Sequence, residues 1–158
     1  MKLRIIEPYY FRDAVKDDAE SLFSVHRAAM REYVEQIWGW DEEWQRQDFH
    51  KKFDSPSNRQ VICASQSPIG WLTLDVSPSS VFVGSIVLHP EHQGRGIGSS
   101  IFNQLIQYSQ ESGTILRLQV FKINVRAQTL YENLGFRVCG ETEHHNQMER
   151  PPEANPDC

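Results

Sequence analysis

The stretch that decides the fold is Gln93-Gly94-Arg95-Gly96-Ile97-Gly98. An apolar, β-branched run (81–88) comes before it, and a run with apolar residues at helical spacing (97–108) follows it. A strand, a glycine-rich turn and a helix in this order present free backbone N–H groups to an anion, because about four N–H groups at a helix start have no partner within the helix. The glycines permit positive φ and close approach of phosphate oxygens. The sequence therefore predicts a phosphate-binding loop.

Other glycine-rich loops match this stretch less well. A Walker loop needs a lysine after its glycines, and none follows here. A dinucleotide fingerprint needs a glycine where Ser99 stands, and no βαβ unit opens before the loop. The remaining alternative is a plain helix start without a ligand, in which each glycine inside the helix would cost about 0.5–1 kcal/mol. A ligand-binding loop is the better interpretation.

A second motif lies one predicted helix and one predicted strand further along the chain. It reads Asn124-x-x-Ala127-x-x-Leu130-Tyr131-x-x-Leu134-Gly135-Phe136. Together with Gln93-x-x-Gly96-x-Gly98, it resembles the two motifs of the GNAT N-acetyltransferase superfamily. The loop pattern alone is common, whereas the pair at this spacing is specific. The resemblance covers about residues 9–149, and its specific part is 81–137.

The resemblance implies an N-acetyltransferase that moves the acetyl group of acetyl-CoA directly to a primary amine, without a metal. The acceptor is either a small molecule or a protein amine. The backbone of Val87 and Leu88 would pair with the pantetheine amides, and Arg95 would pair with a phosphate. The cofactor-binding residues that it implies are Val87, Leu88, Gln93, Gly94, Arg95, Gly96, Ile97, Gly98, Ser99, Asn124, Ala127 and Tyr131. Asn124 could equally cap the following helix.

Tyr131 corresponds to the tyrosine with which the superfamily protonates the departing thiolate. The alternative is an aromatic residue that packs in the core. The general base is less evident, because the strand before the loop has no carboxylate between 85 and 88. Asp75 on the neighbouring strand is the first candidate, followed by His89 and Glu35, and water alone could serve. Each candidate also has an ordinary structural interpretation, as a turn, strand-end or surface residue.

The stretch Trp38-Gly39-Trp40-Asp41-Glu42 would suit a cationic acceptor. The resemblance places the region between the first two helices at the acceptor pocket, and Trp38 and Trp40 could bind an ammonium group by cation–π contact beside Asp41 and Glu42. A hydrophobic hinge between two helices is an equally good interpretation.

Charge is distributed unevenly along the chain. Residues 115–137 carry four basic residues and one acidic residue, whereas residues 35–54 carry six acidic and three basic residues. The first segment would suit the nucleotide end of the cofactor, and the second would suit a cationic substrate. For both segments an ordinary solvated surface is the alternative.

The sequence predicts an α/β (α+β mixed) fold in the order β-α-α-β-β-β-α-β-α-β-β, with a mostly antiparallel sheet and helices on both faces. Asp17-Asp18 and Asp41 are predicted to cap the first two helices, with Trp44 and Phe49 directed inward. We expect one domain over 1–149 and a disordered tail over 150–158. The predicted strands are 9–15, 59–64, 69–75, 81–88, 115–121, 137–142 and 144–149. The predicted helices run from Asp18 to the break at Gly39, over about 42–52, from the glycine-rich loop to about Ser112, and over 125–134.

Composition excludes several classes of protein. The net charge of −5 argues against a nucleic-acid partner, and no apolar run approaches the ~18 residues of a membrane span. There is no recognisable signal peptide. The three cysteines lack disulfide or metal spacing, so we expect a cytoplasmic protein with Cys63 and Cys139 buried and Cys158 exposed.

His26, on the apolar face of its helix, is predicted to be a core histidine, and His144-His145 has no partners at metal-ligand spacing. A homodimer is compatible with the sequence. The alternative function is a non-catalytic acyl-CoA-binding module of the same fold.

Overall fold

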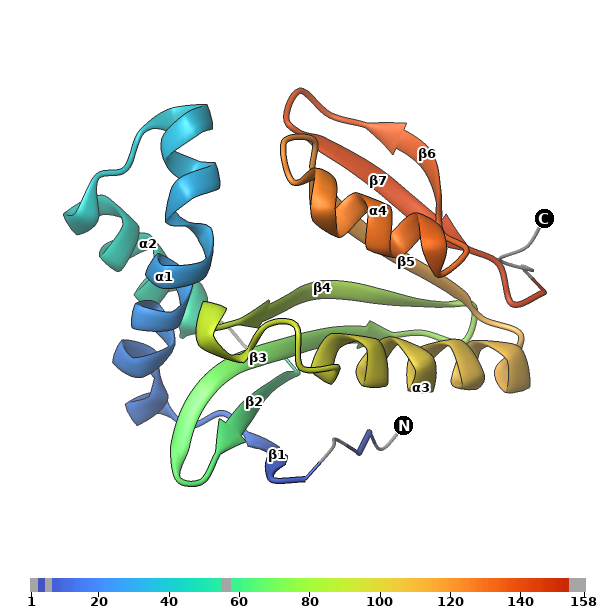
Figure 1. Cartoon of the computed structure of the whole chain (residues 1–158), viewed down its shortest axis with the longest axis horizontal. Coiled ribbons are helices and arrows are strands. Elements are labelled where there is room, and N and C mark those ends of the chain that lie inside the picture. The colour runs from blue at the N-terminus through green and yellow to red at the C-terminus, as the bar shows by residue number, and fades with distance from the viewer. Residues whose placement is uncertain (1–2, 5–6, 55–57, 154–158) are drawn as a thin grey trace. The chain divides into compact units, whose positions relative to one another are not determined.

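A computed structural model describes residues 3–4, 7–54 and 58–153. Its strands and α-helices follow the predicted order (Figure 1). Two short 3-10 helices, η1 (Lys16–Asp18) and η2 (Pro90–His92), are additional. The other elements are β1 (Tyr9–Asp13), α1 (Ala19–Trp38), α2 (Glu42–Phe53), β2 (Arg59–Ala64), β3 (Ser67–Val76), β4 (Ser80–Leu88), α3 (Ile97–Ser112), β5 (Ile115–Phe121), α4 (Val125–Asn133), β6 (Arg137–Glu141) and β7 (His145–Arg150).

The strands form a mixed sheet in the order β1-β2-β3-β4-β5-β7-β6. β1/β2, β2/β3, β5/β7 and β6/β7 are antiparallel, whereas β4 and β5 are parallel. The predicted mixed, mostly antiparallel sheet is therefore confirmed. The chain divides into two compact units, residues 2–73 with 85–101 and residues 74–84 with 102–158, and each is described by itself.

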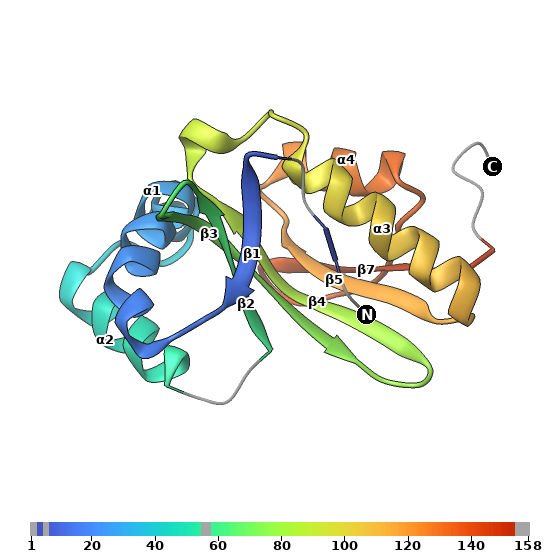
Figure 2. The same cartoon turned by 90° about the horizontal axis from the view of Figure 1, so that it is seen from below.

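In the unit of residues 2–73 and 85–101, α1 and α2 lie side by side (Figures 1 and 2). Asp41 caps α2 as predicted, since its carboxylate accepts a hydrogen bond from Trp44 N at 2.9 Å. Trp44 itself was predicted to point inward, and this was wrong: its side chain is 58% exposed, because it lies in the first turn on the solvent side. The core of this unit contains Ala19, Leu22, Val25, Phe53, Val61, Cys63 and Trp71, with Phe49 and Val87 packed against it.

The start of α1 differs from the prediction. Asp18 precedes the helix but its side chain makes no capping bond to it. The carboxylate instead accepts hydrogen bonds from both terminal nitrogens of Arg12, at 2.8 and 2.6 Å, and from Val15 N at 2.8 Å. Asp18 therefore ties β1 to the start of α1, and it is almost fully buried.

Gly70 allows β3 to approach β4 closely just before the glycine-rich loop. A Cβ atom at this position would lie 2.1 Å from the carbonyl oxygen of Val87. His89 N also donates to Ile69 O at 2.8 Å. The end of β4 is thus fixed in place by contacts that a side chain at residue 70 would prevent.

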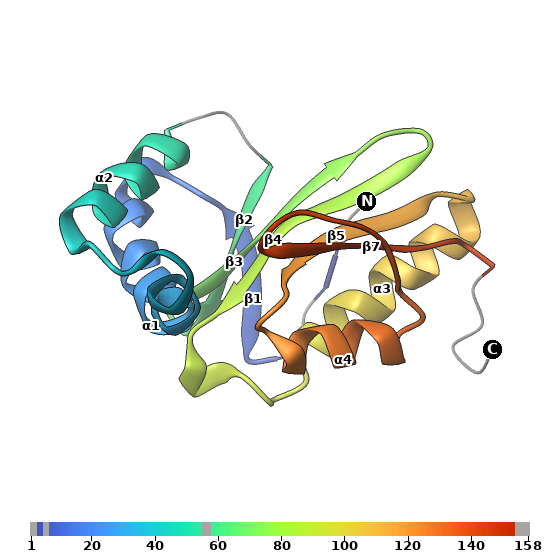
Figure 3. The same cartoon turned by 90° about the horizontal axis from the view of Figure 1, so that it is seen from above.

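In the unit of residues 74–84 and 102–158, β5 alternates between a buried and an exposed face, as a strand with one face in the core must. Its buried face carries Leu116, Leu118 and Val120. β6 and β7 form a hairpin (Figure 1), and β7 pairs with β5 on its other side (Figure 3). β7 ends at Arg150, one residue beyond the predicted end of the last strand. The side chain of Arg150 is buried, and its Nε donates a hydrogen bond to Leu134 O at 2.7 Å.

The cysteines fulfil the predictions in part. Cys63 is buried as predicted, whereas Cys139 is exposed, so the prediction of a buried Cys139 was wrong. The reason is that β6 is the edge strand and Cys139 lies at an irregularity in its pairing with β7. Cys158, like all of the predicted tail after residue 153, lies outside the described residues. In the described part of the chain, no helix has both the length and the apolar character needed to span a bilayer.

Candidate anion-binding loop and active site

The loop between β4 and α3 begins with η2 and then runs through the three glycines (Figure 1). Gly94 and Gly96 have φ angles of +74° and +84°, a backbone region that favours glycine. Ser100 N donates to Gly96 O at 3.0 Å, so the first hydrogen bond of α3 begins at Gly96. The buried side chain of Ile97 anchors the helix start in the core.

The N–H groups from Gly94 to Ser99 are the main feature of this loop. In the described ranges, none of these six consecutive groups donates a hydrogen bond to a protein acceptor. A Cβ atom placed at Gly94 or at Gly98 would meet nothing within 4 Å. The loop therefore presents a row of open donors at a helix N-terminus, which is an anion-binding arrangement.

Hydrogen bonds within the loop hold this shape. The side-chain amide of Gln93 donates to Leu88 O at 2.9 Å, and Glu91 N donates to Nδ1 of His89 at 3.2 Å. Gln93 thus fixes the loop to the end of β4. The Leu88 carbonyl, which the resemblance assigns to pantetheine, already accepts this bond and keeps its second lone pair.

Arg95 contacts Tyr9, a residue that was not among the candidates predicted from the sequence. Its Nη1 is 3.5 Å from the hydroxyl oxygen of Tyr9, which is also 3.2 Å from Nδ1 of His92. The rings of Tyr9 and His92 are in edge-to-face contact. Tyr9 comes from β1, more than 80 residues earlier in the chain, and only its aromatic character in a strand could have drawn attention to it.

Tyr131 lies on α4 in the other unit. Its ring packs against Phe102 and Phe136, with centroids at 5.3 and 6.0 Å. Burial raises the pKa of Tyr131, because the phenolate would lose its hydration. Within the described part of the chain, its hydroxyl has no hydrogen-bond partner. The ring therefore packs in the core, and the hydroxyl is available to bind another group.

Asn124 caps α4. Its side-chain oxygen accepts a hydrogen bond from Ala127 N at 3.1 Å, which confirms the capping interpretation. The Ala127 N–H is consequently engaged within the protein. The exposed guanidinium of Arg126 lies in the same helical turn and forms no ion pair within the described residues.

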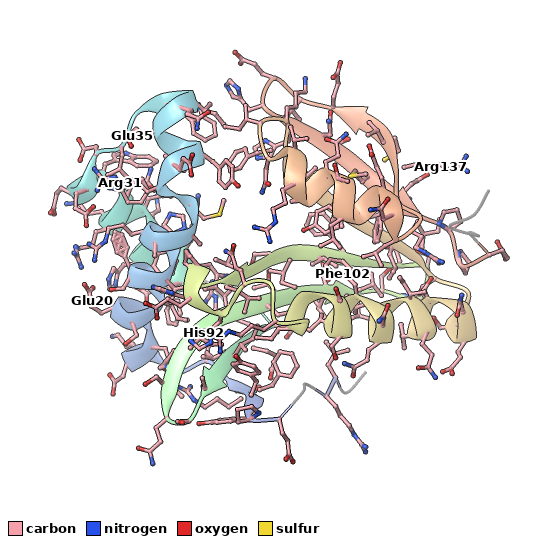
Figure 4. All side chains as sticks on the ribbon, in the orientation of Figure 1. Glu20, Arg31, Glu35, His92, Phe102 and Arg137 are labelled. Carbon is pink, nitrogen blue, oxygen red and sulfur yellow. The ribbon has the colours of Figure 1, made fainter. Side chains whose placement is uncertain are left out.

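The candidate bases differ in their surroundings. Glu35 lies 3.9 Å from Arg31 in an ion pair along α1 (Figure 4), and Nδ1 of His89 accepts from the backbone. Asp75 is exposed in β3, and its carboxylate has no ion pair or hydrogen bond among the described residues. It is therefore the candidate whose carboxylate is open to a ligand.

β4 carries a polar group that sequence reasoning missed. Ser85 accepts a hydrogen bond from the indole N–H of Trp71 at 3.0 Å and shares a second with the hydroxyl of Thr73 at 2.7 Å. Ser85 is thus a neutral group in β4, the strand where a carboxylate base was sought, and its partners Trp71 and Thr73 lie in β3. Trp71 and Thr73 are two residues apart and so share one face of β3, and this spacing was the signal in the sequence that could have revealed the group around Ser85.

The stretch from Trp38 to Glu42 is largely engaged in packing. Trp40 stacks on Phe23, and its indole N–H donates to Glu42 at 2.6 Å. Glu42 also pairs with Arg27. Trp38, in contrast, is 59% exposed. The hinge interpretation thus accounts for Trp40 and Glu42, and Asp41 caps α2.

Ion pairs reduce the charge of both biased segments. In 115–137, Arg117 lies 3.7 Å from Glu149 and Lys122 lies 2.9 Å from Glu141. In 35–54, three of the six carboxylates are paired with a basic neighbour, in the pairs Arg31–Glu35, Arg46–Glu42 and Lys52–Asp48. Neither segment therefore presents its full sequence charge to a ligand.

His26 is a core histidine, as predicted. Its Nε2 lies 3.3 Å from the side-chain oxygen of Gln45, and its ring contacts Phe23, Trp40 and Phe49. Burial lowers the pKa of His26. Across the described ranges, His, Cys, Asp and Glu form no group of three that could hold a metal ion.

The fold and the loop together define an α/β protein whose glycine-rich loop, after the fourth strand, presents backbone N–H groups in an anion-binding arrangement. A model of the acetyltransferase (GNAT) family matches residues 20–136. The chain belongs to this family.

Individual relatives are more distant. An uncharacterized N-acetyltransferase of Methanocaldococcus jannaschii is 26% identical over 141 residues, which is 84% of this chain and 62% of that protein. The N-alpha-acetyltransferase RimI of Mycobacterium tuberculosis is 28% identical over 110 residues, 66% of this chain and 68% of its own length. The chain thus spans about two thirds of these relatives.

Among solved structures, the fold is similar to that of PaiA N-acetyltransferase from Thermoplasma acidophilum, crystallised in complex with coenzyme A. The TM-score is 0.71 at 19% identity, over 90% of this chain and 98% of that one. This similarity confirms the predicted fold.

Proposed function

We propose that the protein is an acetyl-CoA-dependent N-acetyltransferase that acts on a primary amine. The observation that carries this proposal is the row of six unpartnered N–H groups from Gly94 to Ser99, in the loop that resembles the family's acyl-CoA loop. The complex of PaiA with coenzyme A supports the choice of ligand.

The glycine-rich loop would make the first contacts with coenzyme A. The open N–H groups would bind the diphosphate of coenzyme A, and Arg95 would pair with a phosphate. The space beside Gly94 and Gly98 is free for such a group. The backbone of Val87 and Leu88 would then pair with the pantetheine amides in the manner of an added strand.

Tyr131 would supply the proton for the leaving thiolate. An ordinary phenol is about 1.5 pKa units less acidic than an ordinary thiol, a cost of roughly 2 kcal/mol. A hydrogen bond to a charged group contributes about 1.5–3 kcal/mol, which offsets this cost. Burial raises the pKa of Tyr131, and the same dry surroundings would raise that of the thiol. The open hydroxyl of Tyr131 suits this role.

The amine must lose a proton before or during attack. An ordinary lysine amine is about 3.4 pKa units above neutrality, so deprotonation costs about 4.6 kcal/mol. Asp75 is the candidate base with an open carboxylate. The side chain of Trp38 is 59% exposed, and a cation–π contact with it would suit a cationic acceptor.

A thiol-release assay tests the function. The protein is mixed with acetyl-CoA and a panel of primary amines, comprising a polyamine, free amino acids, an aminoglycoside and peptides with a free α-amine, and the CoA thiol is measured with a disulfide reagent. We expect one class of amine to raise release well above the amine-free control. That control is necessary because Cys139 is exposed and reacts with the reagent.

The rival function is a non-catalytic acyl-CoA-binding module. It is favoured by one observation: β4 has no carboxylate, and its two polar side chains, Ser80 and Ser85, are neutral. Tight binding of acetyl-CoA with no amine-dependent release from any member of the panel would contradict the enzymatic proposal and support the rival.

A further inference from the structure

The hydroxyl of Tyr9 forms a bridge between β1 and the anion-binding loop. Tyr9 is only 9% exposed, and its oxygen lies 3.2 Å from Nδ1 of His92 and 3.5 Å from Nη1 of Arg95. Both partners belong to the loop or its 3-10 turn. A buried tyrosine whose hydroxyl contacts the half-buried His92 and the exposed Arg95 is placed to control where these two side chains lie.

One half of this bridge has a fixed direction. A guanidinium can only donate, so the Tyr9 oxygen accepts from Arg95. Toward His92 the direction follows the tautomer: the Tyr9 hydroxyl donates to Nδ1 when that nitrogen is unprotonated, and its oxygen accepts from Nδ1–H when it is protonated. In either case the Tyr9 oxygen joins Arg95 to His92.

We propose that Tyr9 is a positioning residue that holds the Arg95 guanidinium beside the N–H groups of residues 94–99, ready for a phosphate group of coenzyme A. This inference rests on the proposed function. An arginine held in place before binding loses less side-chain freedom when the ligand arrives, so its ion pair contributes more to affinity. Arg95 is otherwise exposed and, in the described part of the chain, has no carboxylate partner.

The test is calorimetric titration of coenzyme A into Tyr9→Phe, which removes the hydroxyl and keeps the ring. We expect the dissociation constant to rise about three- to tenfold, the range for loss of one hydrogen bond. Arg95→Gln is expected to weaken binding at least as much. The double variant should bind no more weakly than Arg95→Gln alone, because Tyr9 acts through Arg95.

Two controls separate positioning from a general structural role. Pantetheine, which lacks every phosphate, should bind Tyr9→Phe and the wild type equally. Tyr10→Phe, on the neighbouring and more exposed position of β1, should leave coenzyme A affinity unchanged. If Tyr9→Phe is too unstable to titrate, His92→Ala replaces it, with a smaller loss of coenzyme A affinity expected and none in the Arg95→Gln background.

Three results would overturn the inference: an unchanged coenzyme A affinity in Tyr9→Phe, a loss that multiplies with that of Arg95→Gln, or an equal loss for pantetheine. A wild-type protein that does not bind coenzyme A would instead refute the proposed function.

Discussion

At the scale of single residues, the proposed chemistry depends on the phenol of Tyr131. Its ring is fixed between Phe102 and Phe136, and its hydroxyl has no partner within the described chain. Because burial raises its pKa, the phenol stays protonated throughout the neutral range. The phenol is therefore in the neutral, protonated form that a general acid needs.

Replacing Tyr131 by Phe removes the proposed acid and keeps the packing. We expect kcat for acetyl transfer to fall about 10²–10⁴-fold, the usual contribution of a positioned acid. The affinity for coenzyme A, measured by calorimetry, should change little. An unchanged kcat would remove Tyr131 from the mechanism, and Tyr108→Phe, on α3, provides a matched control.

Some of these residues could be read from the sequence and others could not. Tyr131 and Asn124 stand in a motif with fixed spacing, so their helix and its cap followed from the pattern. Tyr9 and Ser85 act through partners that folding brings to them from distant strands or loops. Single-sequence patterns hold no information on such pairs.

At the scale of elements, periodicity and capping predicted most boundaries within two residues. β2 was predicted without error because its apolar run is bounded by turn residues, and α2 begins where Asp41 places it. Trp44 was misplaced because α2 has only a few apolar residues, and these do not define its buried face. Asp18 was predicted to cap α1, but its carboxylate binds the side chain of Arg12 in β1 and not the free N–H groups of the helix.

The Asp18–Arg12 pair yields a pH-dependent prediction. The hydrogen bonds from Arg12, joined by that from Val15 N, hold the pKa of Asp18 below its usual range. Such a carboxylate stabilises the fold above its unfolded pKa of about 3.9, and this contribution is lost as the pH falls through the lower folded value. Asp18→Asn should therefore cost about 1–3 kcal/mol at pH 7, and progressively less as the pH falls below 4.

Thermal or urea unfolding at pH 7 and at pH 3 measures this difference. Asp17→Asn is the matched control, since Asp17 is exposed and has no ion pair in the described ranges. An equal cost for Asp18→Asn at both values of pH would show that the carboxylate charge contributes nothing to stability.

At the scale of the whole molecule, the proposed function requires an acidic chain to bind a polyanion. The net charge of −5 gives no attraction at long range, so affinity must come from local donors. The basic segment 115–137 is partly neutralised by Glu149 and Glu141. The N–H groups of residues 94–99 and the guanidinium of Arg95 therefore carry most of the expected affinity.

The most direct test of this account is calorimetric titration of coenzyme A into the wild type and Gly96→Asp. An aspartate there would be strained at φ +84° and would place a carboxylate among the phosphate-binding N–H groups. Gly113→Asp, at φ +73° after α3, carries the same strain and charge away from the loop. We predict that the wild type and Gly113→Asp bind coenzyme A and that a folded Gly96→Asp does not; full affinity in Gly96→Asp would contradict the account.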